Sequence, residues 1–349
     1  MTFNLDKLVR ENVKNLVPYS SARKEFAGAA EIFLDANENS FGSPTEKSFN
    51  RYPDPLQTKI KERIAVWHNV SSEQIFIGNG SDEAIDLLFR VFCEPGKDGI
   101  VTTPPTYGMY EVSANINDVS VKKVLLSAEF ELLAENVLDV ASENTKLIFL
   151  CSPNNPTGNS LSRKEIIKIL ENFGGIIIVD EAYADFSDKP SFTSEIRNFP
   201  NLVVLQTFSK AWGLAGLRVG MAFANGEIIT LLNKVKPPYN VSQIAQEALL
   251  SALDKKVEVE AVVAEIVRQR EILKEELQKF PFITRIYPSD ANFLLVKTTD
   301  ADAIYKQLVE QKIVVRNRTN VELCEGCLRI TIGTPEENQT LLEALKNYE

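Results

Sequence analysis

The stretch TFSKAWGLAGLRVG, Thr207 to Gly220, directly follows the apolar run NLVVLQ. It places Lys210 and Arg218 eight residues apart among small and apolar residues. Both side chains could simply reach water from an ordinary connection between a strand and a helix. Alternatively, the two cations hold a negatively charged ligand and the lysine reacts with it. Residues elsewhere in the chain distinguish these two interpretations.

The composition limits the kind of ligand that the chain can bind. The 349 residues are 44% hydrophobic and 25% charged, which is typical of a globular protein with a large core. The 38 basic and 48 acidic residues give a net charge of −10. An acidic chain without a basic run is a poor candidate for binding DNA or anionic lipid. An anionic ligand therefore has to be met by a local pocket.

The cysteines and the N-terminus indicate a cytoplasmic protein. The N-terminal stretch MTFNLDKLVRENV lacks the apolar segment of a signal peptide, and no run approaches the roughly 18 apolar residues of a membrane helix. We expect the four cysteines to be reduced thiols. Cys324 and Cys327 form a C-x-x-C, which could be half of a zinc site or a redox pair. With no second pair, and His68 as the only histidine, a zinc site lacks ligands, so we predict no metal.

The middle of the chain alternates short apolar runs with helical patterns. Runs such as IFIG, KLIFLC, GIIIVD and NLVVLQ, separated by amphipathic segments, predict a mostly parallel sheet covered on both faces. A charged helical pattern without proline over residues 241–280 then predicts one long helix. The strand and helix patterns of residues 281–349 predict a small α/β domain. The expected division is an N-terminal arm and loop packed on the domains at 1–40, a large domain at 41–240, a connecting helix at 241–280 and a small C-terminal domain at 281–349.

Polar residues follow four of the predicted strands. In a parallel sheet, ligands bind at the carboxyl ends of the strands. Each of these segments alone could be a turn, a strand end or the start of a helix. Together, on four consecutive strand ends, they predict a polar site. The residues concerned are Asn155 after KLIFLC, Asp180 and Tyr183 at the end of GIIIVD, Ser209 and Lys210 after NLVVLQ, and Ser81 and Asp82 after IFIG.

One end of this site is suited to a phosphate, and a lysine lies next to it. A helix that starts at Gly80-Ser81 offers backbone N–H groups to a phosphate. Ser209 and Arg218 could add a hydroxyl and a bidentate guanidinium to the same phosphate. A lysine near a cationic group has a lowered pKa, as a Schiff-base lysine requires, and Lys210 is in that position.

The other end of the site is suited to an aromatic nitrogen heterocycle. Asp180 ends an apolar strand, where its charge needs a cationic partner such as a protonated pyridine nitrogen. Asn155 and Tyr183 are donors suited to a phenolate oxygen, and Tyr107 in PPTYGMY is placed to stack on a flat ring. Phosphate, aldehyde, pyridinium and phenolate together describe pyridoxal 5′-phosphate.

The order of these motifs carries a family resemblance. NGSDE, PPTYGMY, SPNNPTG, VDEAY and SKAWGLAGLRVG resemble the class-II pyridoxal-phosphate-dependent aminotransferases of fold type I. The segments LVPYSSARKEF, LDANENSFG, RYPDP and CLRITIGT are similar to those of the histidinol-phosphate aminotransferases within that class. The motifs span residues 18–334. They imply a large domain with a mostly parallel seven-stranded sheet and a small C-terminal α/β domain.

The resemblance also implies a role for each candidate residue. Lys210 binds the cofactor covalently and moves a proton, and Asp180 keeps the pyridine nitrogen protonated. The remaining cofactor contacts implied are Asn155 and Tyr183 at the ring oxygen, Tyr107 on the ring, and Ser81, Asp82, Ser209 and Arg218 at the phosphate.

The substrate residues and the assembly follow from the resemblance alone. Tyr52 in RYPDP is expected to reach the phosphate in a neighbouring subunit, which implies a homodimer with shared active sites. Arg329 is expected to hold the carboxylate or phosphate of the substrate. Arg316, Asn37 and Tyr19 are expected to line the substrate site.

The implied reaction interconverts histidinol phosphate and 2-oxoglutarate with imidazole acetol phosphate and glutamate, by ping-pong kinetics. An aromatic amino acid aminotransferase and a decarboxylase of a phosphorylated amino acid remain alternatives, because one fold supports many activities. A regulator that senses the cofactor is a further alternative, although the sequence shows neither an added DNA-binding domain nor a basic patch.

Overall fold

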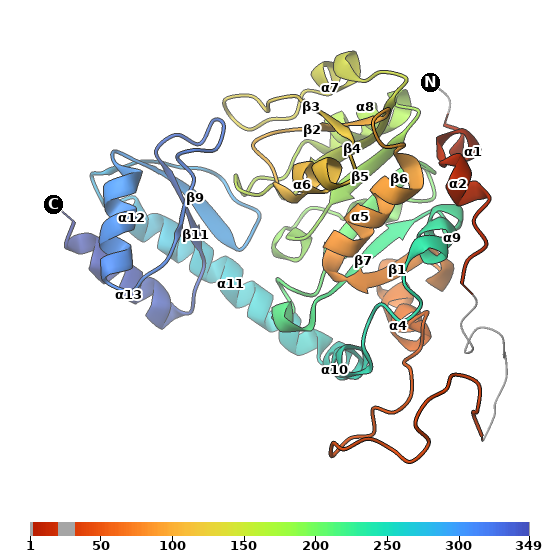
Figure 1. Ribbon diagram of the computed structural model, residues 1–349. Helices are drawn as coiled ribbons and strands as arrows, with labels where there is room; N and C mark the ends of the chain where they lie inside the picture. Colours follow the sequence, from red (N-terminus) through yellow and green to blue (C-terminus); the bar gives the residue numbers. More distant parts are fainter. Residues whose placement is uncertain (1–2, 20–31, 349) are drawn as a thin grey trace.

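A seven-stranded sheet forms the centre of the molecule in the computed structural model, which describes residues 3–19 and 32–348 (Figure 1). Residues 20–26 of the LVPYSSARKEF motif lie outside the described residues. The strand order is β1-β7-β6-β5-β4-β2-β3. Strand β7 runs antiparallel to both β1 and β6, and the other neighbours are parallel, so the predicted mostly parallel sheet is confirmed. The strands are β1 (Ile75–Asn79), β2 (Gly99–Thr102), β3 (Ser120–Lys123), β4 (Thr145–Cys151), β5 (Ile176–Asp180), β6 (Leu202–Thr207) and β7 (Val219–Ala224).

Helices cover both faces of this sheet because the central strands are apolar on both sides. In β5, Ile176 and Ile178 pack into one core while Ile177 and Val179 pack into another. The first core is closed by α5 (Gly80–Phe92), α6 (Met109–Ile116) and α9 (Gly226–Val235). The second is closed by α4 (Thr58–His68), α7 (Ala134–Val140), α8 (Arg163–Asn172) and α10 (Gln243–Leu253). Among the described residues, no helix has the length and apolar character needed to cross a membrane.

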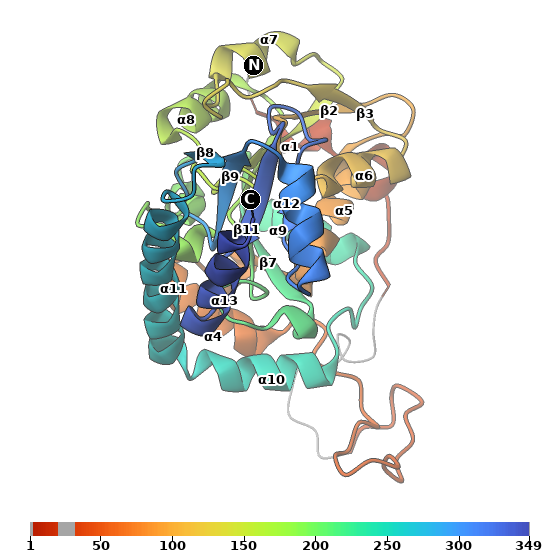
Figure 2. The ribbon, with the colours of Figure 1, turned by 90° about the vertical axis from the view of Figure 1, so that its left-hand side faces the viewer.

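A second, four-stranded antiparallel sheet lies beside the first in Figure 1 and in front of it in Figure 2. Its order is β10-β11-β9-β8, and its core includes Leu273 and Leu277 of the long helix α11. Its elements are β8 (Ile283–Ile286), β9 (Phe293–Thr298), α12 (Ala301–Glu310), β10 (Arg316–Asn317), β11 (Cys327–Thr331) and α13 (Pro335–Lys346). The short 3-10 helices are η1 (Ser72–Gln74), η2 (Ala184–Phe186), η3 (Phe192–Glu195) and η4 (Ala215–Leu217).

The expected single helix over 241–280 is two helices in the structure. Helix α10 ends at Leu253, and α11 begins at Lys256 and runs to Leu277. Arg63 of α4 donates a 2.9 Å hydrogen bond to the carbonyl of Leu250 and pairs with the carboxylate of Asp254. This contact takes up a carbonyl in the last turn of α10, and α11 then leaves in a new direction (Figure 1). The domain division itself stays a prediction.

The N-terminal region packs on the large sheet only in part, unlike the expectation for residues 1–40. The short helices are α1 (Leu5–Leu8) and α2 (Glu11–Lys14), and Val13 of α2 and Val9, between the two helices, are buried against the α5 side of the sheet. The segment 32–56 instead extends away from the body of the molecule (Figure 1). Its Leu34 and Phe41 side chains are exposed. We call residues 32–56 the arm.

Gly220 in β7 lets that strand lie directly against the start of α5. A Cβ atom at this position would be 2.2 Å from the backbone nitrogen of Ser81 and 2.5 Å from the carbonyl carbon of Gly80. We predict that Gly220→Ala lowers the free energy of unfolding by at least about 2 kcal/mol, because backbone must move to admit the methyl group. Urea unfolding measures this. Gly108→Ala is the control, since Gly108 has a helical φ of −66° and open space around its Cβ position. Equal stability of the two variants would contradict the prediction.

Candidate active site

The predicted site residues meet at one edge of the large sheet. Strands β4, β5 and β6 are neighbours, and their carboxyl ends lead to Asn155, Asp180 and Lys210. The expectation of four consecutive strand ends is wrong in one respect, because β7 separates β6 from β1. Since β7 is antiparallel, it begins at this same edge and brings Arg218, the residue before it, into the site.

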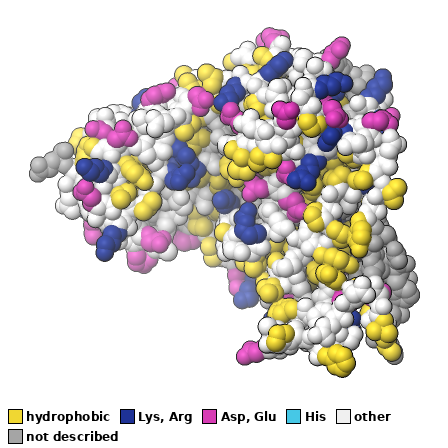
Figure 3. Space-filling view, in the orientation of Figure 1, with side chains coloured by type: hydrophobic (Ala, Val, Ile, Leu, Met, Phe, Trp, Pro, Cys, Tyr) yellow, Lys and Arg dark blue, Asp and Glu magenta, His cyan; other side chains and the backbone are white. Residues whose placement is uncertain are grey.

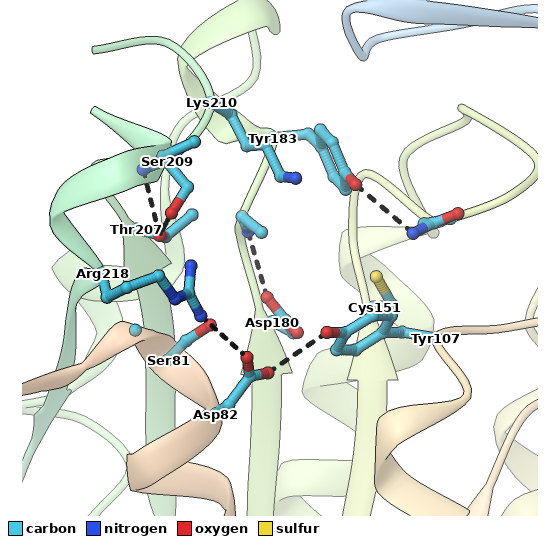
Figure 4. A pocket seen from close by; sticks show the side chains of 14 residues that line it. Ser81, Asp82, Tyr107, Cys151, Asp180, Tyr183, Thr207, Ser209, Lys210 and Arg218 are labelled. Carbon is cyan, nitrogen blue, oxygen red and sulfur yellow. Dashed lines mark hydrogen bonds and ion pairs between the residues drawn. The ribbon is translucent and has the colours of Figure 1, made fainter. Parts of the chain in front are cut away.

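A cavity of about 180 Å³ lies at this edge (Figure 4). It brings together nine of the predicted residues: Ser81, Asp82, Tyr107, Asn155, Asp180, Tyr183, Ser209, Lys210 and Arg218. The other lining residues are Gly80, Cys151, Ala182, Thr207 and Ala215.

Arg218 and the start of α5 form one end of the cavity. The backbone N–H of Gly80 donates to the carbonyl of Arg218 at 2.8 Å, and the Arg218 guanidinium pairs with Asp82 at 3.3 Å. A Cβ on Gly80, whose φ is +68°, would be 2.8 Å from this guanidinium. Ser209 is held nearby by Thr207, whose Oγ1 accepts its backbone N–H at 3.1 Å. This end combines a helix N-terminus, a hydroxyl and a guanidinium, which together suit an oxyanion.

Asp180 is a buried carboxyl group at the floor of the cavity. Its Oδ2 accepts a 2.7 Å hydrogen bond from the Tyr110 hydroxyl, and its Oδ1 accepts a 3.1 Å bond from the backbone N–H of Ala182. Burial raises the pKa of Asp180 to about 6, although these two hydrogen bonds oppose the rise. A buried acid of this kind is suited to a cationic partner from a ligand.

Lys210 extends from the loop after β6 towards Tyr183 (Figure 4). Its Nζ lies 5.7 Å from the centre of the Tyr183 ring. Although the Lys210 side chain as a whole is exposed, partial burial of its ammonium group lowers the pKa, and the charges of Arg329 and Arg218 lower it further. A lysine with a lowered pKa supplies a neutral amine more readily, which nucleophilic attack requires.

Asn155 connects the two sheets through its side chain. Its Nδ2 donates to the Tyr183 hydroxyl at 3.3 Å, and its Oδ1 accepts from Nη1 of Arg329 on β11. The Arg329 guanidinium also lies 5.2 Å from the centre of the Phe293 ring. Arg329 therefore reaches the edge of the cavity from the smaller sheet.

Tyr107 lies on the side of the cavity nearest α6. Its hydroxyl donates to Oδ1 of Asp82 at 3.2 Å, and its ring meets Tyr110 edge-on at 5.5 Å. Burial and the charge of Asp82 raise the pKa of Tyr107, so the hydroxyl remains a hydrogen-bond donor.

Five predicted residues do not line this cavity within the chain, and one of them, Arg329, reaches it only through its bond to Asn155. Tyr52 stacks on Tyr239 at 4.4 Å, and Asn37 is exposed in the arm with a φ of +55°. Tyr19 is exposed beside a separate pocket formed with residues 54–58 and 233–238. Arg316 lies on β10, directly opposite Arg329.

Two residues that were not predicted from the sequence hold the predicted ones in place. Tyr110 bonds to Asp180, and its spacing of three residues from Tyr107 at the start of a helix is the signal that could have identified it. Thr207 holds Ser209, and a hydroxyl two residues before a serine in a turn is a comparable signal.

A third missed group fixes the start of α5. The Glu83 carboxylate accepts the backbone N–H of Asn79 at 2.6 Å and the side chain of Asn240 at 2.9 Å. Lys236 donates to Asn240 at 3.0 Å and to the carbonyl of Pro55 at 2.8 Å. These contacts join the N-terminus of α5 to the end of the arm, and no sequence motif marked them.

The arrangement can hold a flat ligand with an anionic group at one end and a protonated ring nitrogen at the other. Arg218 and α5 meet the anion, Asp180 meets the nitrogen, and Lys210 lies beside the space between them. An amine in that position can form a covalent bond to a carbonyl group of the ligand.

The matching family, one of the similar sequences and two of the similar solved structures are aminotransferases. The chain matches the family described as aminotransferase class I and II over residues 31–345. It is 59% identical over 344 residues to a histidinol-phosphate aminotransferase of Parabacteroides distasonis, covering 99% of both chains. The crystal structure of the histidinol-phosphate aminotransferase from Clostridium acetobutylicum superposes with a TM-score of 0.79 at 27% identity, over 85% of this chain and 90% of that one. That of Sinorhizobium meliloti, solved in complex with pyridoxal-5′-phosphate, shares the fold with a TM-score of 0.77 at 24% identity, over 90% of both chains.

The raised pKa of Asp180 predicts how the free energy of unfolding of the ligand-free protein depends on pH. An ordinary aspartate loses its proton near pH 3.8 and the folded Asp180 near pH 6, so the folded chain binds more protons between these values. Stability should therefore fall as the pH rises from 4 to 7, by on the order of 3 kcal/mol from this group. Asp180→Asn should remove that part of the decline. Urea unfolding at pH 4, 5, 6 and 7 measures the difference between the two proteins; a constant difference would contradict the prediction.

Proposed function

We propose that this chain, which belongs to the aminotransferase class I and II family, transfers the amino group of histidinol phosphate to 2-oxoglutarate with pyridoxal 5′-phosphate as its cofactor. The products are imidazole acetol phosphate and glutamate, and the reaction belongs to histidine biosynthesis. One observation supports this above all: a single cavity joins Lys210, the buried acid Asp180 and the oxyanion end at Arg218. The 59% identity to a named histidinol-phosphate aminotransferase, over 99% of both chains, supports the choice of substrate.

The residues of the cavity fit the cofactor at each of its polar groups. The bound cofactor supplies an aldehyde that takes up the amino group and a protonated ring that withdraws electrons from the substrate. Asp180 would hold the ring nitrogen, because burial raises the pKa of its carboxyl group and a protonated nitrogen beside it would stabilise the carboxylate. Arg218, Ser209 and the first turn of α5, with Ser81 and Asp82, would hold the phosphate. Tyr107 would cover the ring.

Lys210 has two tasks in this proposal. As a neutral amine it would hold the cofactor covalently, and its lowered pKa makes that form more available. The same amine would be placed to carry the proton of the substrate α-carbon. Asn155 and Tyr183, which are hydrogen-bonded to each other at 3.3 Å, donate to the ring oxygen and fix the orientation of the ring.

The substrate anion would be met by residues of the smaller sheet and the arm. Arg329 is aimed at the cavity by its bond to Asn155 and can take a carboxylate or a phosphate through its guanidinium. Arg316 lies opposite it on β10. Asn37 and Tyr19 would line the site from the N-terminal region of a neighbouring copy.

Steady-state kinetics test the reaction. We expect the highest kcat/KM with histidinol phosphate as amino donor and 2-oxoglutarate as acceptor, above phenylalanine and threonine phosphate by at least about tenfold, because the extra polar contacts are worth more than about 1.4 kcal/mol. Lys210→Ala is the control. It should lose the reaction, the visible absorbance of the bound cofactor and the mass increase that borohydride reduction fixes on the wild-type chain. A higher kcat/KM with either competitor would reject the substrate assignment.

We further propose that the enzyme works as a homodimer in the cytoplasm. The arm carries exposed apolar side chains, including Leu34, Phe41 and Leu56. Figure 3 shows hydrophobic side chains gathered on the lower part of the molecule, where the arm lies. A second copy that covers this surface would receive Tyr52 at its own phosphate end. The four cysteines, which are free thiols, fit a reducing compartment.

The assembly leads to a separate prediction. Sedimentation should give twice the 39.0 kDa chain mass. Tyr52→Phe should raise the dissociation constant of the cofactor about tenfold, because one hydrogen bond to a charged phosphate is worth about 1.5 kcal/mol. Tyr305→Phe on α12, away from the arm, should leave it unchanged. A monomer would reject the shared site, and an unchanged dissociation constant in Tyr52→Phe would reject the role of Tyr52.

A further inference from the structure

Buried polar atoms without a partner gather at one place in the smaller sheet. Across residues 3–19 and 32–348, six buried side-chain nitrogen or oxygen atoms lack a hydrogen-bond partner. Three of them are Nε of Arg318, Oγ1 of Thr319 and Nε of Arg329. Buried polar groups in folded proteins are nearly always paired, so an unpaired group of this kind indicates a ligand site.

The strand register places three arginines on one face of the sheet. Arg316 on β10 is directly opposite Arg329 on β11. The backbone N–H of Arg318 donates to the carbonyl of Cys327 at 2.8 Å, which continues the same ladder. Side chains two residues apart lie on the same face of a strand, and opposed residues share a face. Arg316, Arg318 and Arg329 therefore point the same way, whereas Asn317 lies on the other face and bonds to Asp302 of α12.

This face is the one that meets the cavity. Arg329 donates to Asn155, which lines the cavity. Burial raises the pKa of Tyr183, and the charges of Arg329 and Arg318 oppose that rise, so Arg318 also acts on a cavity residue. Burial, together with the charges of Arg329 and Arg316, lowers the pKa of Arg318 to about 10. Within the described part of the chain, none of the three arginines forms an ion pair with an acidic side chain.

We infer that Arg318 is a specificity residue that, with Arg329 and Arg316, binds the phosphate group of the amino donor. This inference rests on the proposed function, which supplies two anionic substrates for one site. A phosphate ester carries a charge of about −1.5 to −2 at pH 7, whereas the side-chain carboxylate of glutamate carries −1. Three guanidiniums without acidic partners match the larger charge and its three oxygens. Two guanidiniums remain for the carboxylate when Arg318 is removed. Arg318 therefore favours the phosphorylated substrate over glutamate.

The experiment measures the two half-reactions separately. The holoenzyme is mixed in single turnovers with histidinol phosphate, histidinol or glutamate, and the absorbance of the bound cofactor gives each second-order rate constant. We expect Arg318→Gln to lower the constant for histidinol phosphate at least tenfold and those for histidinol and glutamate less than threefold. Arg318→Lys keeps the charge without the bidentate geometry and should lie between. Arg268→Gln, an exposed arginine paired with Glu265 on α11, is the matched control.

Inhibition by inorganic phosphate gives a readout that does not depend on the amino donor. In the reaction of glutamate, phosphate should inhibit the wild-type enzyme, and Arg318→Gln should raise its inhibition constant at least tenfold. Equal losses with all three donors would show that Arg318 only supports the fold, and no loss would show that it does not contact the phosphate. Either result overturns the inference. If Arg318→Gln does not fold, the same comparison is made with Arg318→Lys.

Failure of the proposed function is distinguishable from failure of this inference. A wild-type enzyme that does not convert histidinol phosphate rejects the proposed function. In that case an unchanged inhibition constant for phosphate in Arg318→Gln also rejects the role of Arg318, whereas a tenfold rise supports it independently of the natural donor.

Discussion

The close contact between β7 and the start of α5 is the constraint on which the site depends. Gly220 leaves no room for a side chain against Gly80 and Ser81, so strand and helix meet through their backbones. The carbonyl of Arg218 accepts the N–H of Gly80, and the Arg218 side chain then turns back over Asp82. A helix N-terminus and a guanidinium are thereby held around the same space. The antiparallel direction of β7 is what brings this arginine to the carboxyl edge of an otherwise parallel sheet.

Asp180 and Lys210 are not paired with each other, which leaves both groups available to a ligand. Asp180 is buried with only a tyrosine hydroxyl and a backbone N–H, and burial raises its pKa. Burial lowers the pKa of Lys210, and the charges of Arg329 and Arg218 lower it further. Pairing Asp180 directly with Lys210 would have relieved both, but it would also have removed a reactive amine and an acid able to bind a cation. Leaving Asp180 and Lys210 unpaired lowers the stability of the fold, but it keeps both groups available for the reaction.

The sequence predicted that Asn155, Asp180 and Lys210 meet in one place, because their positions follow a topological rule. Parallel strands end at one edge, so Asn155, Asp180 and Lys210 could be placed together without coordinates. Three features needed long-range contacts. The break between α10 and α11 involves Arg63, far away in the chain. The position of β7 between β6 and β1 is a matter of strand order. The arm has exposed apolar side chains that the described residues 3–19 and 32–348 do not cover, so its position could not be predicted from packing.

The loop after β4, with the turn-like sequence NNPTG, connects the large sheet to the smaller one through several hydrogen bonds. Asn155 in this loop contacts Tyr183 of the large sheet and Arg329 of the small one. Three residues further on in the loop, the carbonyl of Gly158 accepts the N–H of Asp290 at 2.8 Å. A Cβ on Gly158, whose φ is +87°, would lie 2.7 Å from Oγ of Ser289. One short loop thus fixes the position of the Asn155 amide and the approach of the smaller sheet together. In the proposed function, a shift of Arg329 on binding the substrate would therefore also shift Asn155, which would couple substrate binding to cofactor orientation through a single side chain.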